Sequence, residues 1–163
     1  MRKLYTALAW TVAGAVAVQS AAIAFAFGGM LNLVSEGGVV DKALLESFQA
    51  GGVGEVGFMI HGIVGGVLIP LLALALLVVS FFVPVRGTTM WAAIVLGVVA
   101  LQVVLGFSIT DSPYLGLIHG ANALAVVATA SFAALRVQRA GKADSADTPV
   151  APSEGASSDA VAA

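Results

Sequence analysis

The stretch that decides the fold is residues 57–83, GFMIHGIVGGVLIPLLALALLVVSFFV, which contains no acidic residue, lysine or arginine. It is longer than the roughly 20 residues that an α-helix needs to cross the hydrocarbon of a bilayer. Apolar and polar residues do not alternate along it, so a transmembrane β-strand is disfavoured. Residues 57–83 are therefore predicted to form a membrane-spanning helix.

Three more apolar stretches of similar length flank this one. The four predicted spans cover about residues 4–28, 56–83, 88–108 and 113–136. The composition agrees, because 60% of the residues are hydrophobic and 10% are charged, against about 45–50% and about 25% in soluble domains. We predict an all-α fold, a transmembrane four-helix bundle with up-down-up-down topology and short loops between the last three spans.

The basic residues set the predicted orientation. An even number of spans puts both ends of the chain on one side of the membrane. The basic residues on that side are Arg2, Lys3, Arg86, Arg136, Arg139 and Lys142. Only Lys42 lies on the other side, so the positive-inside rule predicts an N-in, C-in topology.

Residues 1–139 form the predicted transmembrane domain, and residues 140–163 a disordered cytoplasmic tail without apolar periodicity. The first apolar stretch follows basic residues as in a signal peptide, but it is longer than the roughly 7–15 residues of a signal h-region. We therefore expect it to be retained as a span. In the outer loop, residues 29–55, the segment 41–48 between two glycine pairs predicts a short amphipathic helix with Asp41 near its N-cap.

Charge and cysteine content exclude several functions. The net charge is −2, which gives no indication of nucleic-acid binding. The absence of cysteine excludes disulfides, thiolate metal sites, iron–sulfur clusters and covalently attached c-type haem. The predicted spans contain no carboxylate, lysine or nucleophile–base pair, so catalysis by the chain on its own is not expected.

Polar side chains inside the spans cost free energy in lipid and therefore need a reason. The two histidines of the chain, His61 and His119, each lie about six residues inside the outer end of a span, or about 9 Å below the boundary. Gln19 and Gln102 approach the same depth from the opposite direction. One polar residue from each helix is therefore predicted to meet in a layer in the outer half of the bundle.

The second and fourth helices of such a bundle are diagonal and parallel, so the two histidines are predicted to face each other across the core. The gap suits an iron porphyrin with one imidazole on each side, and histidine is a usual axial ligand of haem iron. Zinc is disfavoured, because it takes about four ligands. We predict one haem b with His61 and His119 as axial ligands of its iron. Interhelical hydrogen bonding and a proton or ion path remain the alternatives.

The neighbours of the two histidines fit this hypothesis. Neutral amides can orient an imidazole and fix its tautomer. The amides expected to do so are Gln19, Gln102 and Asn122. Small residues next to a ligand histidine let a macrocycle approach the helix backbone, although the same pattern packs membrane helices without any cofactor. The glycines expected to give this clearance are Gly57, Gly65 and Gly116.

The second span also contains a proline and a group of glycines. Pro70 has no N–H and removes a backbone hydrogen bond to Gly66, which predicts a kink below His61. Gly62, Gly65 and Gly66 suit a homodimer interface as well as packing inside the bundle.

The segment Leu101-Gln-Val-Val-Leu-Gly106, followed by Pro113 and Leu117-Ile-His119, resembles helices 3 and 4 of one four-helix half of the haem A synthases. In that family a glutamine-containing helix ends in Leu-Gly, and the next helix holds a haem-ligand histidine near its outer end. His61 stands at the place of the helix 2 ligand. Phe58 stands where those enzymes have a glutamate, and this chain has one four-helix unit where the synthases have two.

The whole chain is also similar to small four-helix membrane proteins of high-GC Gram-positive bacteria. The shared residues are Arg2, Tyr5, Leu8-Ala9-Trp10, His61 and His119-Gly-Ala-Asn122. This similarity implies the fold and a place in the bacterial cytoplasmic membrane, but no activity. The expected function is electron transfer or haem handling, with a quinone or a redox partner protein as counterpart. The alternative is a cofactor-free accessory subunit or small carrier.

Overall fold

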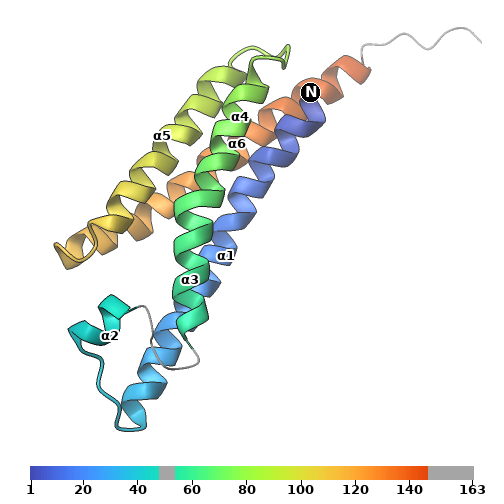
Figure 1. Cartoon of the computed structure of the whole chain (residues 1–163). Coiled ribbons are helices and arrows are strands. Elements are labelled where there is room, and N and C mark those ends of the chain that lie inside the picture. The colour runs from blue at the N-terminus through green and yellow to red at the C-terminus, as the bar shows by residue number, and fades with distance from the viewer. Residues whose placement is uncertain (48–53, 147–163) are drawn as a thin grey trace, which may run out of the picture.

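Helices account for most of the chain in a computed structural model, which describes residues 1–47 and 54–146 (Figure 1). The elements in chain order are α1 (Arg2–Ser35), α2 (Lys42–Ser47), α3 (Glu55–Ile63), η1 (Val64–Leu68), α4 (Ile69–Ser80), α5 (Thr88–Phe107) and α6 (Pro113–Ala146). The π-helical segment η1 joins α3 directly to α4, so these three elements form one continuous rod. Within the described residues there is no β-strand.

Four helical rods are long and apolar enough to cross a membrane. They are Arg2–Ser35, Glu55–Ser80, Thr88–Phe107 and Pro113–Ala143, and each contains the greater part of one predicted span. The predicted all-α class is confirmed, and the chain has the character of a multi-pass membrane protein. The orientation of the bundle relative to the cytoplasm stays a prediction.

The four rods form a bundle in which sequential rods are neighbours. The helix α4 packs against α1 and α5, and α6 packs against the same two helices, so α4 and α6 lie on opposite corners. The start of α1, the α4–α5 loop and the last turns of α6 lie at the same end of the bundle (Figure 1). This arrangement is the predicted up-down-up-down topology.

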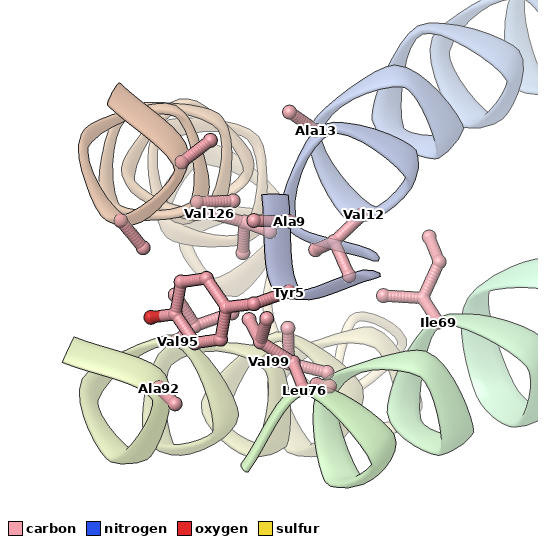
Figure 2. Close-up of a cluster of buried hydrophobic side chains, with 14 of the residues drawn as sticks. Tyr5, Ala9, Val12, Ala13, Ile69, Leu76, Ala92, Val95, Val99 and Val126 are labelled. Atoms are coloured by element: carbon pink, nitrogen blue, oxygen red, sulfur yellow. The ribbon is translucent and has the colours of Figure 1, made fainter. Parts of the chain in front are cut away.

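The apolar core fills the half of the bundle at that end, which we call the inner half (residues 2–16, 69–99 and 126–146). Its largest fully buried side chains include Tyr5, Val12, Leu76, Val95 and Val126 (Figure 2). The buried Tyr5 hydroxyl donates a hydrogen bond to the Thr88 backbone oxygen at 3.1 Å. The first turns of α1 are thereby tied to the start of α5.

The remaining part of the four rods, which we call the outer half, is divided into two helix pairs. The helix α3 packs along α1, and α5 packs along α6. Toward the end that bears α2, the α1–α3 pair and the α5–α6 pair run apart (Figure 1). Large apolar side chains such as Met59, Leu101 and Leu117 are exposed there, as expected for a surface that faces lipid.

The first rod is longer than its predicted span, because α1 continues through Gly28 and Gly29 to Ser35. Glycine lowers helix propensity by about 1 kcal/mol but does not end a helix by itself. The helix ends at Ser35 with Glu36 as its C-cap, because the φ of 88° at Gly37 breaks the helical path. The Gly38 N–H donates to the Leu33 oxygen at 2.9 Å. This hydrogen bond from the second residue after the C-cap is typical of the Schellman motif.

The outer loop contains the predicted short helix. The helix α2 begins at Lys42, and the Leu44 N–H donates to Asp41 Oδ1 at 2.8 Å, so the predicted N-cap is confirmed. Phe48, the predicted end of this helix, lies outside the described residues. At the other end of the chain, α6 extends to Ala146, past the predicted start of the tail at residue 140. This extension contains alanine and lysine, which are good helix formers. Residues 147–163 lie outside the described part of the chain.

Candidate functional site

The two histidines meet in the outer half, one from each helix pair. His61 is on α3 and His119 is on α6, and their ring centroids lie 6.2 Å apart with an angle of 57° between the ring planes. Both side chains are partly buried. The predicted pairing of the histidines across the bundle is therefore present in the structure.

His119 is held by Gln102 of the neighbouring helix α5. Its Nδ1 lies 3.1 Å from the Gln102 backbone oxygen, and its Nε2 lies 3.1 Å from the Gln102 side-chain nitrogen. The Asn122 side-chain nitrogen donates to Gln102 Oε1 at 2.7 Å and to the Val98 backbone oxygen at 3.0 Å. Every polar atom of the Gln102 side chain therefore has a partner.

These contacts assign the tautomer of His119. The carbonyl next to Nδ1 can only accept a hydrogen bond, so Nδ1 bears the proton. The Gln102 side-chain nitrogen can only donate, so Nε2 of His119 presents its lone pair. The tautomer of His119 is thereby fixed, with its Nε2 lone pair directed at the Gln102 amide.

His61 makes the corresponding contact with Gln19 of the neighbouring helix α1. Its Nδ1 lies 3.2 Å from the Gln19 backbone oxygen. In the amide orientation that satisfies its surroundings, the Gln19 side-chain nitrogen lies 2.9 Å from the same Nδ1. A protonated Nδ1 donates to the carbonyl, and an unprotonated Nδ1 accepts from the amide, so each neutral tautomer has a partner.

The histidines thus repeat one local arrangement in both helix pairs. In each pair, Nδ1 of a histidine lies against the backbone oxygen of a glutamine on the adjacent helix. The structure brings together Gln19, His61, Gln102, His119 and Asn122, which are the residues of the predicted polar layer. Their roles as haem ligands and ligand-orienting residues stay predictions.

The three glycines predicted to give clearance have protein neighbours. A Cβ at Gly57 would meet the Ala22 backbone oxygen of α1, and a Cβ at Gly116 would lie 3.1 Å from the Ile109 side chain. A Cβ at Gly65 would lie 2.7 Å from the end of the Gln19 side chain. Close packing of α3 on α1 thus accounts for Gly57, whereas Gly65 and Gly116 face side chains. Clearance for a porphyrin stays a prediction.

Two features of the site were not predicted from the sequence. Gly106 lies against the His119 ring, because a Cβ there would come within 3.1 Å of Cε1. The segment η1 follows His61 directly and has π-helical spacing, with the Ile69 N–H donating to the Val64 oxygen five residues earlier. Gly65-Gly66 shortly before Pro70 is the sequence signal for this irregularity, because Pro70 cannot continue the regular hydrogen-bond ladder.

Comparisons of the chain with protein-family models, curated proteins and solved structures found no match. Within the described residues, no three His, Cys, Asp or Glu side chains are grouped so that they could hold a metal ion among them.

Proposed function

We propose that this chain is a protein of the bacterial cytoplasmic membrane that binds one haem b between His61 and His119, for electron transfer or haem handling. The observation that supports it best is the distance between the imidazole rings. Two imidazoles bound at about 2 Å on opposite sides of one metal ion have their ring centroids about 6 Å apart. The two rings here lie 6.2 Å apart.

The donor chemistry supports the same group. A porphyrin supplies four nitrogen ligands, so two imidazoles complete the coordination of its iron without any further side chain. His119 already presents the Nε2 lone pair, and the Nδ1–H tautomer of His61 presents the same atom. The carbonyls of Gln19 and Gln102 then hold both rings through Nδ1–H, which raises the basicity of a ligand imidazole.

The two histidines belong to different helix pairs, His61 to the α1–α3 pair and His119 to the α5–α6 pair. A flat group held by both imidazoles would therefore lie between the pairs. The Gln102 side-chain nitrogen lies 3.1 Å from His119 Nε2 and has to leave that atom when iron binds. A haem iron with two imidazole ligands supplies reversible one-electron transfer, for which a quinone or a redox partner protein is the proposed counterpart.

A second candidate function rests on the completeness of the polar network. His119, Gln102 and Asn122 satisfy one another without any added group. Interhelical hydrogen bonds of this kind contribute about 0.6–2 kcal/mol each in membranes. A cofactor-free accessory subunit or small carrier, with a polar layer that only joins the helices, is therefore the alternative.

Optical spectra of the purified full-length protein distinguish the two candidates. After expression in haem-supplied cells, the proposal predicts a low-spin Soret band that sharpens and shifts on reduction. His61→Ala and His119→Ala should each abolish the low-spin spectrum, and the double variant should look little worse than either single one. Ile63→Ala and Ile118→Ala, on exposed positions of the same helices, serve as controls and should keep it.

Two results would overturn the proposal. One is a folded protein that stays colourless although haem is supplied, which would favour the cofactor-free alternative. The other is a single histidine variant that keeps a spectrum with two imidazole ligands, because the chain has no third histidine.

A further inference from the structure

The π-helical segment η1 changes which side of the second rod faces the bundle. In α4 the buried residues are Ile69, Ala73, Leu76 and Ser80, which lie on one face at spacings of three and four. Continued toward the N-terminus with regular α-helical spacing, this face would include Gly66 and Gly62. Both glycines are exposed instead, and a Cβ on either would meet nothing within 4 Å.

The residues that face the bundle beyond η1 are displaced by one position. Gly57 is buried against α1, Val64 packs against the core, and His61 lies against Gln19 and His119. A π-helical turn inserts one extra residue into the helix, which rotates everything before it by about one residue, or about 100°. The extra residue is therefore what turns His61 toward His119.

The Gln19 side chain lies on the backbone where this irregularity begins. With its amide oriented to satisfy its surroundings, its nitrogen lies 3.0 Å from the His61 backbone oxygen and its oxygen lies 3.0 Å from the Gly65 nitrogen. A regular α-helix would pair these two backbone groups with each other, since they are four residues apart. Gln19 is buried at this position, and Gly65 has no side chain that would push it away.

We propose that Gln19 is a positioning residue, whose side-chain amide holds the second rod in the π-helical register and thereby keeps His61 opposite His119. Unpaired backbone groups are costly where no water can replace the partner. The His61 carbonyl also accepts from the Val64 N–H, so removal of the amide mainly deprives the Gly65 N–H of the Gln19 oxygen. The regular α-helical register gives that N–H the His61 oxygen as its partner. That register moves Gly62 to the place of His61. The inference concerns the helix and does not require that haem binds.

Cysteine cross-linking without haem tests the register, because the natural chain contains no cysteine. Two double variants are compared in membranes with a short thiol-specific cross-linker: His61→Cys with His119→Cys, and Gly62→Cys with His119→Cys. Neither double variant removes the contacts of the Gln19 amide with the backbone atoms of residues 61 and 65, because the substitutions change only side chains. Cleavage at methionine with cyanogen bromide then separates the two positions at Met90 unless they are cross-linked.

The 61–119 pair should cross-link several-fold more than the 62–119 pair when Gln19 is present. Gln19→Leu should reverse this preference. Gln19→Glu, at a pH at which the new carboxyl group is protonated, should restore the preference for the 61–119 pair. A protonated carboxyl group, like the amide, can donate one hydrogen bond and accept another. Gln102→Leu removes an equivalent amide from the other helix pair and is the matched control, with no expected change in preference.

A preference for the 61–119 pair that persists in Gln19→Leu would overturn the inference. If the Gln19→Leu variant does not accumulate in the membrane, Gly65→Ala tests the same point. Its Cβ would lie 2.7 Å from the end of the Gln19 side chain and should displace the amide from the backbone. An unchanged preference in that variant would overturn it equally. Neither outcome bears on haem binding, which the optical spectra test separately.

Discussion

In the inner half of the bundle, α4 and α6 both pack against α1 and α5, and small or branched apolar side chains fill the space between the four rods. In the outer half the rods form two pairs, and contacts between a glutamine and a histidine join the helices within each pair. His61 and His119 face each other from one pair to the other. The comparison indicates that apolar packing joins all four rods in the inner half, whereas polar contacts join the helices within each pair of the outer half.

The largest effect is expected from a cavity in the inner half. Leu76 on α4 is fully buried, whereas Leu74 on the same helix is 48% exposed. Leu76→Ala should lower the free energy of unfolding by about 2–5 kcal/mol, because a buried leucine leaves a cavity that collapses only in part. Leu74→Ala is the matched control, with an expected change of about 0.5 kcal/mol. Unfolding by SDS in mixed micelles, followed by circular dichroism, measures both, and equal losses would contradict the position of the core.

A smaller effect is expected where α3 approaches α1 in the outer half. Gly57→Ala places a Cβ against the Ala22 backbone oxygen, which cannot move without the helix. It should lower the free energy of unfolding by about 1–3 kcal/mol, as overpacked positions do. Gly62→Ala adds the same methyl group in open space and should be neutral or slightly stabilising, because alanine is the better helix former. Equal destabilisation by both variants would show that the α1–α3 contact is not as close as described.

The sequence was sufficient for the helices and for the polar layer. Four long apolar stretches predict four rods, and the matched depths of His61 and His119 predict that the two side chains meet. Asp41 was recognised as an N-cap because a side-chain acceptor at the start of a helix acts on its own first turn. These features depend on local pattern or on helix geometry alone.

The features that could not be predicted depend on contacts between helices. Beside η1, the Gln19 amide of another helix lies against the His61 oxygen and the Gly65 nitrogen, and no periodicity within residues 57–83 indicates that contact. The sequence also does not show which neighbours Gly57, Gly65 and Gly116 face, which are Ala22, Gln19 and Ile109. The helix α1 continues past the predicted end of the span at residue 28 to Ser35, because Gly28 and Gly29 lower helix propensity without ending a helix.

The most direct test of the account is pulsed electron paramagnetic resonance of the oxidised, haem-supplied protein labelled with ¹⁵N-histidine. A single haem held by both histidines of the chain predicts one low-spin iron whose unpaired electron couples to two axial imidazole nitrogens. Coupling to only one imidazole, or the absence of any haem signal from a folded preparation, would contradict the claim that His61 and His119 form one binding site.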